Sequence, residues 1–142
     1  MEWDPTISPI IENTPYMAAT VNFGPQTVTK SHRDSQNLSF GCCCIIVGRN
    51  FNHQKGGHLH LEEMKINMEV AAGDVVFIPS ASVKHGNLDI NSDTGETRYS
   101  FTMYTAGSIF SWQSIHKRIR YGKSEKKTRR RRKEMGEWVG VI

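Results

Sequence analysis

Residues 58–87 read HLHLEEMKINMEVAAGDVVFIPSASVKHGN, and the fold expected for the chain follows from the pattern inside this stretch. From Met64 to Val70 every second residue is apolar and those between are polar, which is the period of a half-buried β-strand. AAG then predicts a turn. VVFIP predicts a buried strand that Pro79 ends, because proline has no N–H to offer a neighbouring strand. The stretch therefore predicts short strands joined by tight turns.

Similar strands are expected on both sides of this stretch. FGCCCIIVG, at residues 40–48, is an apolar block bounded by glycines, as expected of a buried strand. RYSFTMYT, at residues 98–105, alternates again and has an aromatic edge. Turn-forming clusters such as NHQKGG and NSDTGE separate these runs. Short strands at this spacing predict a mainly β chain, folded as a sandwich or barrel.

Length and composition restrict the class of protein. The chain has 142 residues, the length of one domain, with 37% hydrophobic and 23% charged residues. These proportions argue against a disordered chain, and no run approaches the roughly 18 apolar residues of a membrane span. The N-terminus has acids and prolines where a signal peptide would have a basic start and an apolar run, so we expect a non-secreted protein. Cys42, Cys43 and Cys44 are adjacent, which predicts small apolar residues of a buried strand and argues against a zinc site or disulfide framework.

Charge and prolines divide the chain into three parts. Three prolines and the lack of a sustained period predict an N-terminal arm at residues 1–20, followed by a β core at residues 21–116. Residues 1–116 contain 7 Lys/Arg and 11 Asp/Glu, whereas the tail at residues 117–142 contains 11 Lys/Arg and 3 Asp/Glu. The core is therefore mildly acidic, and the basic run of the tail is either a solvated helix or a disordered arm.

The basic tail has three interpretations. It can neutralise phosphates of a nucleic acid, it can act as a nuclear-localisation signal, which would make the protein nuclear, or it is a solvated charged terminus. On the first interpretation, the residues expected to contact nucleic acid are Lys126, Lys127, Arg129, Arg130, Arg131 and Arg132.

An ordered set of polar residues predicts a metal site. His32 and Asp34 form an H-x-D pair, and residues two apart on an extended backbone face the same side. His85 follows after a strand that ends in proline, and Arg98 comes thirteen residues later. Two histidines and one carboxylate leave three positions open on a metal, which suits non-haem Fe(II) with a bidentate 2-oxo acid. Arg98 can hold the far carboxylate of that acid, and Ser100 on the same face can add a hydroxyl contact.

Each of these residues also has an ordinary explanation. An H-x-D by itself is more commonly a solvated turn, and a single arginine on a strand is usually a surface charge. The ordered set, rather than any one member, supports His32, Asp34 and His85 as the metal-binding and catalytic residues.

A second set of histidines competes with the first. His58, His60 and Glu62 share one face of a predicted strand, and the run from Gly73 to His85 resembles the second cupin motif. His58, His60 and His85 are therefore the ligands of an alternative, cupin-type metal site. The alternative interpretation is that His58 and His60 lie on a half-exposed strand and bind no metal.

Five strings carry a resemblance to a known family: NFGPQTVTKSHRD, NLSFG, KGGHLHL, GDVVFIPSASVKHGN and ETRYSFTMYTAGSIFSW. They resemble a fungal family of 2-oxoglutarate/Fe(II) oxygenases, grouped with the TET/JBP nucleic-acid base oxygenases and often found near transposons in mushroom genomes. The resemblance runs from about Asn22 to Trp112. It places the family's H-x-D on His32 and Asp34, its distal histidine on His85 and its 2-oxoglutarate arginine on Arg98.

This resemblance implies a fold and a function. The fold is a double-stranded β-helix of the jelly-roll or cupin-like kind, and the activity is oxidation of 5-methylcytosine or N6-methyladenine in nucleic acid, expected to be DNA. Family members normally have a longer N-terminal region, so the resemblance also implies a core that lacks N-terminal support elements. Two alternatives stay open: a catalytically incomplete, transposon-associated fragment that binds nucleic acid, and the cupin-type metal protein.

Overall fold

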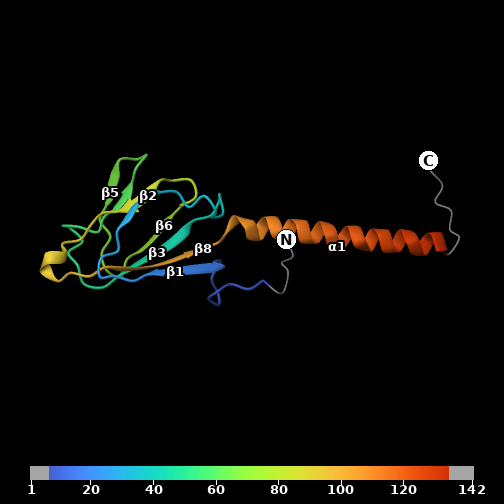
Figure 1. The fold of residues 1–142 in the computed structure, drawn as a ribbon, viewed down its shortest axis with the longest axis horizontal. Coiled ribbons are helices and arrows are strands. Elements are labelled where there is room, and N and C mark those ends of the chain that lie inside the picture. Colours follow the sequence, from blue (N-terminus) through green and yellow to red (C-terminus); the bar gives the residue numbers. More distant parts are fainter. Residues whose placement is uncertain (1–6, 135–142) are drawn as a thin grey trace. The chain divides into compact units, whose positions relative to one another are not determined.

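The computed structural model describes residues 7–134 of the chain, and these fall into two compact units. The sheet unit comprises the described residues up to Ser108, and the helical unit begins at Ile109. The elements of both are labelled in Figure 1. All the residues that the sequence analysis assigns to a metal centre lie in the sheet unit.

Two antiparallel four-stranded sheets form the sheet unit. The first sheet has the strand order β1-β8-β3-β6 and the second has the order β2-β7-β4-β5. The strands of the first sheet are β1 (Ala18–Asn22), β3 (Cys43–Gly48), β6 (Val75–Ile78) and β8 (Tyr99–Tyr104). The strands of the second sheet are β2 (Thr29–His32), β4 (Leu59–Leu61), β5 (Ile66–Met68) and β7 (His85–Asn87). The prediction of a mainly β chain is confirmed.

The core lies between the two sheets. It is a cluster of buried side chains from both sheets and from the loops that join them: Cys43, Val47, Phe51, Leu59, Leu61, Val70, Ile78 and Ile90. In the first sheet, the inward row includes Thr20, Thr102 and Ile45, which are aligned by the strand register. The inward face thus mixes apolar with polar groups, and the polar ones line a cavity described below.

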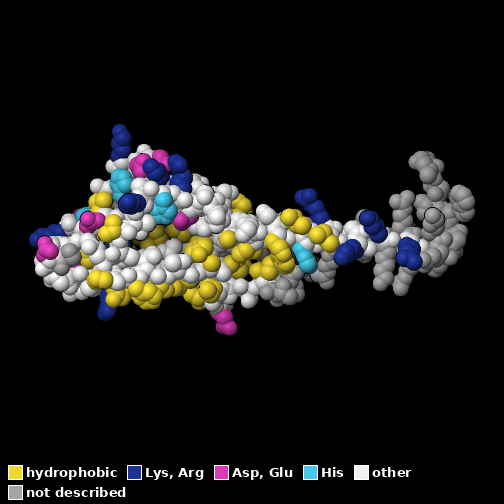
Figure 2. All heavy atoms as spheres, viewed as in Figure 1, with side chains coloured by type: hydrophobic (Ala, Val, Ile, Leu, Met, Phe, Trp, Pro, Cys, Tyr) yellow, Lys and Arg dark blue, Asp and Glu magenta, His cyan; other side chains and the backbone are white. Residues whose placement is uncertain are grey.

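The outward face of the first sheet is apolar. Its register aligns Val21, Phe101, Ile46 and Val75 in one row across the four strands. The neighbouring row ends at Phe77, which is 61% exposed. In Figure 2 hydrophobic side chains gather along the lower side of the sheet unit, where β1 lies in Figure 1.

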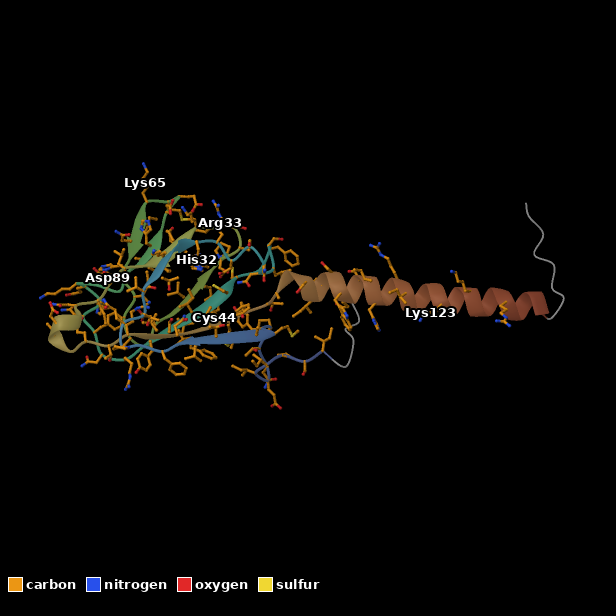
Figure 3. The ribbon with its side chains drawn as sticks, viewed as in Figure 1. His32, Arg33, Cys44, Lys65, Asp89 and Lys123 are labelled. Carbon is orange, nitrogen blue, oxygen red and sulfur yellow. The ribbon has the colours of Figure 1, made fainter. Side chains whose placement is uncertain are left out.

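The prediction of a strand from Met64 to Val70 is wrong in its extent. The chain instead forms a hairpin, in which β4 and β5 are joined by a turn that Lys65 N–H closes onto the carbonyl of Glu62 at 3.2 Å. Lys65 has a positive φ of 54° and projects away from the sheets (Figure 3). Only Ile66–Met68 keeps the strand conformation, because the chain reverses direction at residues 62–65 and β5 then pairs with β4 over three residues.

The cysteine prediction is confirmed for two residues. Cys43 and Cys44 are buried in β3, whereas Cys42 precedes the strand and is exposed. All three thiols are free. Adjacent positions on a strand point to opposite faces, so Cys43 faces the second sheet and Cys44 faces outward.

Helical structure is confined to two segments of the described chain. A short 3-10 helix, η1, spans Ser92–Thr94, and α1 spans Gly107–Glu134. The basic run is therefore helical, one of the two states expected for it. Residues 107–116, expected at the end of the β core, are helical too, and residues 18–20, expected in the arm, belong to β1. Within the described residues, no helix is both long and apolar enough to cross a bilayer.

Two neighbours on β6 test which face of the first sheet is buried. Ile78 is 4% exposed in the core, so Ile78→Ala should lower the free energy of unfolding by about 2–5 kcal/mol. Phe77 points the other way, and Phe77→Ala should cost less than about 1 kcal/mol. Urea denaturation of both variants measures the difference. A larger loss for Phe77→Ala than for Ile78→Ala would mean that the assignment of the two faces is wrong.

Candidate metal centre

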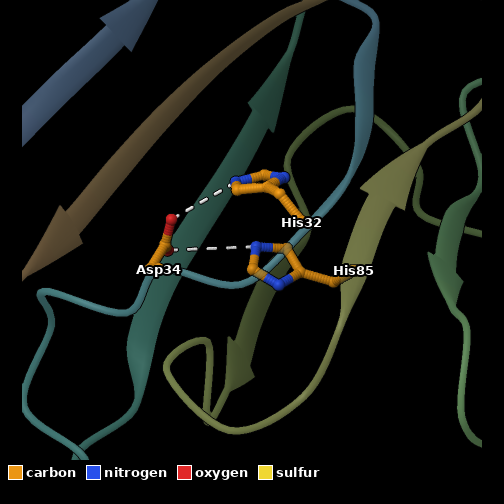
Figure 4. A group of neighbouring side chains, drawn as sticks. All are labelled: His32, Asp34 and His85. Atoms are coloured by element: carbon orange, nitrogen blue, oxygen red, sulfur yellow. Dashed lines mark ion pairs between the residues drawn. The ribbon is translucent and has the colours of Figure 1, made fainter.

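His32, Asp34 and His85 form a compact group of potential metal ligands. One ligand atom from each lies within 4.8 Å of the others, and within the described part of the chain this is the only such group of three. His32 Nε2 is 3.2 Å from Asp34 Oδ1, and His85 Nε2 is 3.9 Å from Asp34 Oδ2 (Figure 4). The structure therefore brings together the three residues that the sequence predicted as ligands; their role in binding a metal stays a prediction.

Strand pairing places the two histidines side by side. β2 and β7 are antiparallel, and His32 is the direct partner of His85. The ladder also pairs Thr29 with Asn87, so β2 has one more residue than β7 between the two pairs, which is a β-bulge. Gly86 faces this bulge, and a Cβ on it would lie 2.6 Å from the carbonyl oxygen of Thr29. The glycine thus permits the bulge that turns His32 toward the cavity.

Backbone carbonyls set the orientation of both imidazoles. His32 Nδ1 is 2.8 Å from the carbonyl oxygen of Lys30, and His85 Nδ1 is 3.0 Å from that of Val83. A carbonyl only accepts, so each Nδ1 carries the hydrogen and donates it. In the neutral imidazole the lone pair is then on Nε2, and it is the Nε2 atoms that face Asp34. This arrangement is typical of metal-binding histidines, whose second nitrogen is held by a hydrogen bond.

Asp34 lies in the loop that follows β2 and is held there by Ser80 and Asn37. Its backbone N–H donates to the carbonyl of Ser80 at 2.9 Å. Asn37 Nδ2 donates to Asp34 Oδ2 at 3.2 Å and to Ser80 Oγ at 3.1 Å. The amide of Asn37 therefore fixes the carboxylate between the two histidines, a contact that the sequence analysis did not anticipate.

The three residues lie on the wall of a cavity of about 700 Å³ between the two sheets. Arg98 and Ser100 lie on the same wall, so the cavity contains every core residue that the sequence analysis assigned to iron or to the co-substrate. Other polar groups of the wall were not predicted. They come from the inward faces of strands and from the loop after β2: Thr20, Asn22, Thr29, Gln36, Asn37, Asn87 and Thr102. Their sequence signal is a polar residue at every second position of an otherwise apolar strand, which is weak in a single sequence.

Arg98 is a buried charge without a partner for one of its donors. Its side chain is 3% exposed, and Nε has no hydrogen-bond acceptor among the described residues. No carboxylate of the described residues forms an ion pair with it either. Burial lowers the pKa of the Arg98 guanidinium, but arginine remains protonated in proteins. A buried charge without a counterion is costly, so the cavity beside Arg98 is suited to bind an anion.

Ser100 lies close to Arg98 with its hydroxyl in the cavity wall. It is 7% exposed, and its Oγ accepts a hydrogen bond from Asn22 Nδ2 at 3.1 Å. Having accepted this bond, the hydroxyl keeps its own hydrogen for an acceptor within the cavity. Arg98 and Ser100 together offer donors suited to one carboxylate.

Cys43 also lines the cavity, but it is not suited to bind a metal in competition with the triad. Burial raises the pKa of the Cys43 thiol, and a weaker opposing effect comes from a hydrogen bond with Ser80. A neutral thiol is a poor metal ligand, since the thiolate is the form that binds. We assign Cys43 to the apolar part of the wall.

The alternative set of His58, His60 and His85 is not brought together. Leu59 and Leu61 are buried, so His60 between them points to the opposite face of the second sheet. Leu61 pairs directly with His85, which places His85 on the inner face. Neighbouring positions on a strand cannot share a face, and this alternation excludes the cupin-type site.

Local contacts also hold the polar members of that alternative set. His60 Nδ1 contacts Asn67 Oδ1 on β5 at 2.6 Å. Glu62 Oε1 accepts from Lys84 Nζ at 2.6 Å, and Ser31 donates to its other oxygen. These hydrogen bonds and the ion pair lower the pKa of the Glu62 carboxyl.

The residues predicted to contact nucleic acid lie on α1, in the helical unit. Lys126 and Arg130 are exposed. The side chains of Lys127, Arg129, Arg131 and Arg132 lie outside the described residues, although their backbone is part of α1.

The donor set fits Fe(II). Two imidazole nitrogens and one carboxylate oxygen converge from one side, which leaves three positions of an octahedral ion for other ligands. The guanidinium of Arg98 lies in the same cavity, and its Nε has no partner among the described residues. It fits a co-substrate that carries a second carboxylate. Both observations suit iron together with 2-oxoglutarate.

Asn37→Ala should weaken metal binding without removing a ligand. The Asp34 carboxylate loses the amide that orients it, and such outer contacts are typically worth about 10- to 100-fold in metal affinity. Mn²⁺, a stable stand-in for Fe(II), can be titrated by calorimetry. Asn67→Ala is the matched control, because Asn67 contacts His60 on the outer face and its loss should leave Mn²⁺ affinity unchanged. Equal affinities for Asn37→Ala and wild type would refute this role of Asn37.

No protein-family model matches the chain, and no curated protein matches it. Among solved structures, its fold is similar to that of NgTET1 in complex with 5mC DNA, with a TM-score of 0.52 and 22% sequence identity. The similarity covers 64% of this chain and 34% of that one, so this chain spans about a third of the length of its structural neighbour. At this identity the likeness shows the fold. The chain has a TET-like double-stranded β-helix, as the sequence resemblance implied.

Proposed function

We propose that the chain is an Fe(II)- and 2-oxoglutarate-dependent dioxygenase that oxidises a methylated base in nucleic acid. One observation carries this proposal: a group of two histidines and one aspartate shares a cavity with a buried guanidinium whose Nε has no partner among the described residues. A structural metal site would not require the arginine, and a structural arginine would be expected to have an ion-pair partner.

Each residue of the site has a distinct task in this proposal. His32 and His85 bind the metal through Nε2, in the tautomer that their backbone contacts already impose, and Asp34 supplies a carboxylate oxygen. Arg98 binds the distal carboxylate of 2-oxoglutarate through charge-assisted hydrogen bonds. Iron and 2-oxoglutarate, when bound, supply the oxidation of a substrate C–H bond by dioxygen. Ile45 and Leu59 give the cavity apolar walls that limit the access of water.

The proposed substrate is a methylated nucleobase, and 5-methylcytosine in DNA is favoured over N6-methyladenine. The structural neighbour NgTET1 was solved in complex with 5mC DNA, which supports this choice. A base inside a duplex cannot reach a ligand set in a cavity between two sheets, so it would have to be flipped out of the stack. The sequence resemblance to fungal transposon-associated oxygenases supports the same substrate class.

The basic half of α1 is proposed to hold the nucleic acid by its phosphates. Lys123, Lys126 and Arg130 are exposed and follow one another at helical spacing on one face. Such a stripe gives affinity that depends on salt and not on sequence. The same run has the composition of a nuclear-import signal, which supports a nuclear location for the protein.

Turnover with defined substrates tests the enzyme proposal. With Fe(II), ascorbate and 2-oxoglutarate, a 5-methylcytosine duplex should stimulate succinate release, and His32→Ala should abolish it through loss of a ligand. Arg98→Ala should raise the KM for 2-oxoglutarate about 10- to 100-fold, the equivalent of one or two charge-assisted hydrogen bonds. His60→Ala, on the outer face, is the matched control and should behave as wild type.

The possible outcomes separate the remaining alternatives. Turnover that no methylated duplex stimulates would keep the iron site and exclude the nucleobase. Iron binding without turnover would favour the catalytically incomplete module that binds nucleic acid. Absence of iron binding would contradict the whole proposal.

The salt dependence of duplex binding tests the helix. Lys126→Gln combined with Arg130→Gln should lower the slope of log affinity against log salt by about 2, because each lost phosphate contact contributes about 0.9. Lys55→Gln combined with Lys65→Gln removes the same charge from exposed positions of the sheet unit and should change the slope much less. Equal slopes for the two double variants would show that the helix makes no special contribution.

A further inference from the structure

Arg98 is fixed in the fold through its backbone. Its N–H donates to the carbonyl of Pro25 at 2.9 Å, and the hydroxyl of Thr27 donates to its carbonyl oxygen. Gln26 forms an isolated parallel bridge with Arg98 at the same place. These contacts fix the backbone of Arg98, but none of them fixes the position of its guanidinium.

The side chain of Arg98 lies near two residues of the loop between β3 and β4, Phe51 and Gly57. Its Cζ lies 5.9 Å from the ring centroid of Phe51. On Gly57, an added Cβ would lie 3.2 Å from Arg98 Cδ and 2.8 Å from Phe51 Cε2. It would also lie 3.2 Å from Ile90 Cγ2. A side chain at position 57 would therefore clash with the Phe51 ring and press on the methylene stem of Arg98.

Gly57 cannot move away to make room for a larger residue. Its N–H donates to the carbonyl of Asp89 at 2.9 Å, and its φ of +74° is one that residues with a side chain rarely adopt. The preceding Gly56 is equally confined, because a Cβ there would lie 2.4 Å from the carbonyl oxygen of Asp89. Gly56 and Gly57 thus let the backbone of their loop pack directly against the backbone of Asp89, next to the side chain of Arg98.

We propose that Gly57 is a positioning residue for the co-substrate anchor. It acts through Arg98: the empty position behind the stem directs the guanidinium over Phe51 and into the cavity, in the place where a carboxylate can meet it. This inference rests on the proposed use of 2-oxoglutarate. On this inference Gly57, which is not a ligand, controls the affinity for 2-oxoglutarate and leaves the affinity for the metal unchanged.

The experiment separates these two affinities. Calorimetry measures Mn²⁺ binding to the protein and then 2-oxoglutarate binding to the Mn²⁺-loaded protein. Gly57→Ala should weaken 2-oxoglutarate binding at least about tenfold, as expected for the loss of one charge-assisted hydrogen bond, and should change Mn²⁺ affinity less than about twofold.

Gly95→Ala is the matched control. Gly95 has the same φ of +74°, but an added Cβ there meets nothing within 4 Å. It therefore imposes the same backbone strain without a contact to Arg98, and 2-oxoglutarate affinity should stay at the wild-type value. Equal losses in Gly57→Ala and Gly95→Ala would overturn the inference, because strain alone would then explain them.

A second pair of variants keeps the test open if Gly57→Ala does not fold. Phe51→Leu removes the atom that the new methyl would meet at 2.8 Å, so Phe51→Leu and Phe51→Leu/Gly57→Ala are compared instead. The added methyl still crowds Arg98 Cδ and should weaken 2-oxoglutarate binding several-fold. Equal affinities in this pair would overturn the inference. If wild type with Mn²⁺ binds no 2-oxoglutarate, the proposed function fails first, and the two failures are distinguishable.

Discussion

The antiparallel pairing of β2 with β7 is the constraint on which the rest of the site depends. It sets His32 opposite His85 on the inner face of the second sheet, and the bulge opposite Gly86 turns the end of β2 toward Asp34. Carbonyl oxygens of the same two segments hold both imidazoles with Nε2 directed at the carboxylate. A shift of one residue in this ladder would exchange the faces and separate the three groups, because side chains alternate along a strand.

A second constraint comes from the buried charge of Arg98. Placing a guanidinium in a protein interior without an anion costs stability, and such costs are usually retained where a function requires them. The fold accommodates the charge rather than neutralising it. The backbone is fixed by Pro25 and Thr27, and the stem passes beside Gly57. The positive charge therefore lies at the cavity that His32, Asp34 and His85 also line.

Spacing in the sequence was sufficient to predict His32, Asp34, His85 and Arg98 as members of one site, and the structure places all four on the wall of one cavity. It was not sufficient to discard His58 and His60, because an H-x-H on a strand has the same appearance on either face. Only the burial of Leu59 and Leu61 shows that His60 points outward. The turn at residues 62–65 was missed because the alternation that begins at Met64 already starts inside it, and the pattern does not show that the chain reverses direction there.

The sequence by itself determined the class of the fold and selected the residues proposed for the site, because hydrophobic period and residue order can be read along the chain. The tertiary structure decided everything that depends on two segments meeting. It aligned β2 with β7, brought Asn37 against Ser80 and placed Gly57 beside the side chain of Arg98. Such contacts join residues dozens of positions apart, and they are set by strand register and close packing, which no local pattern encodes.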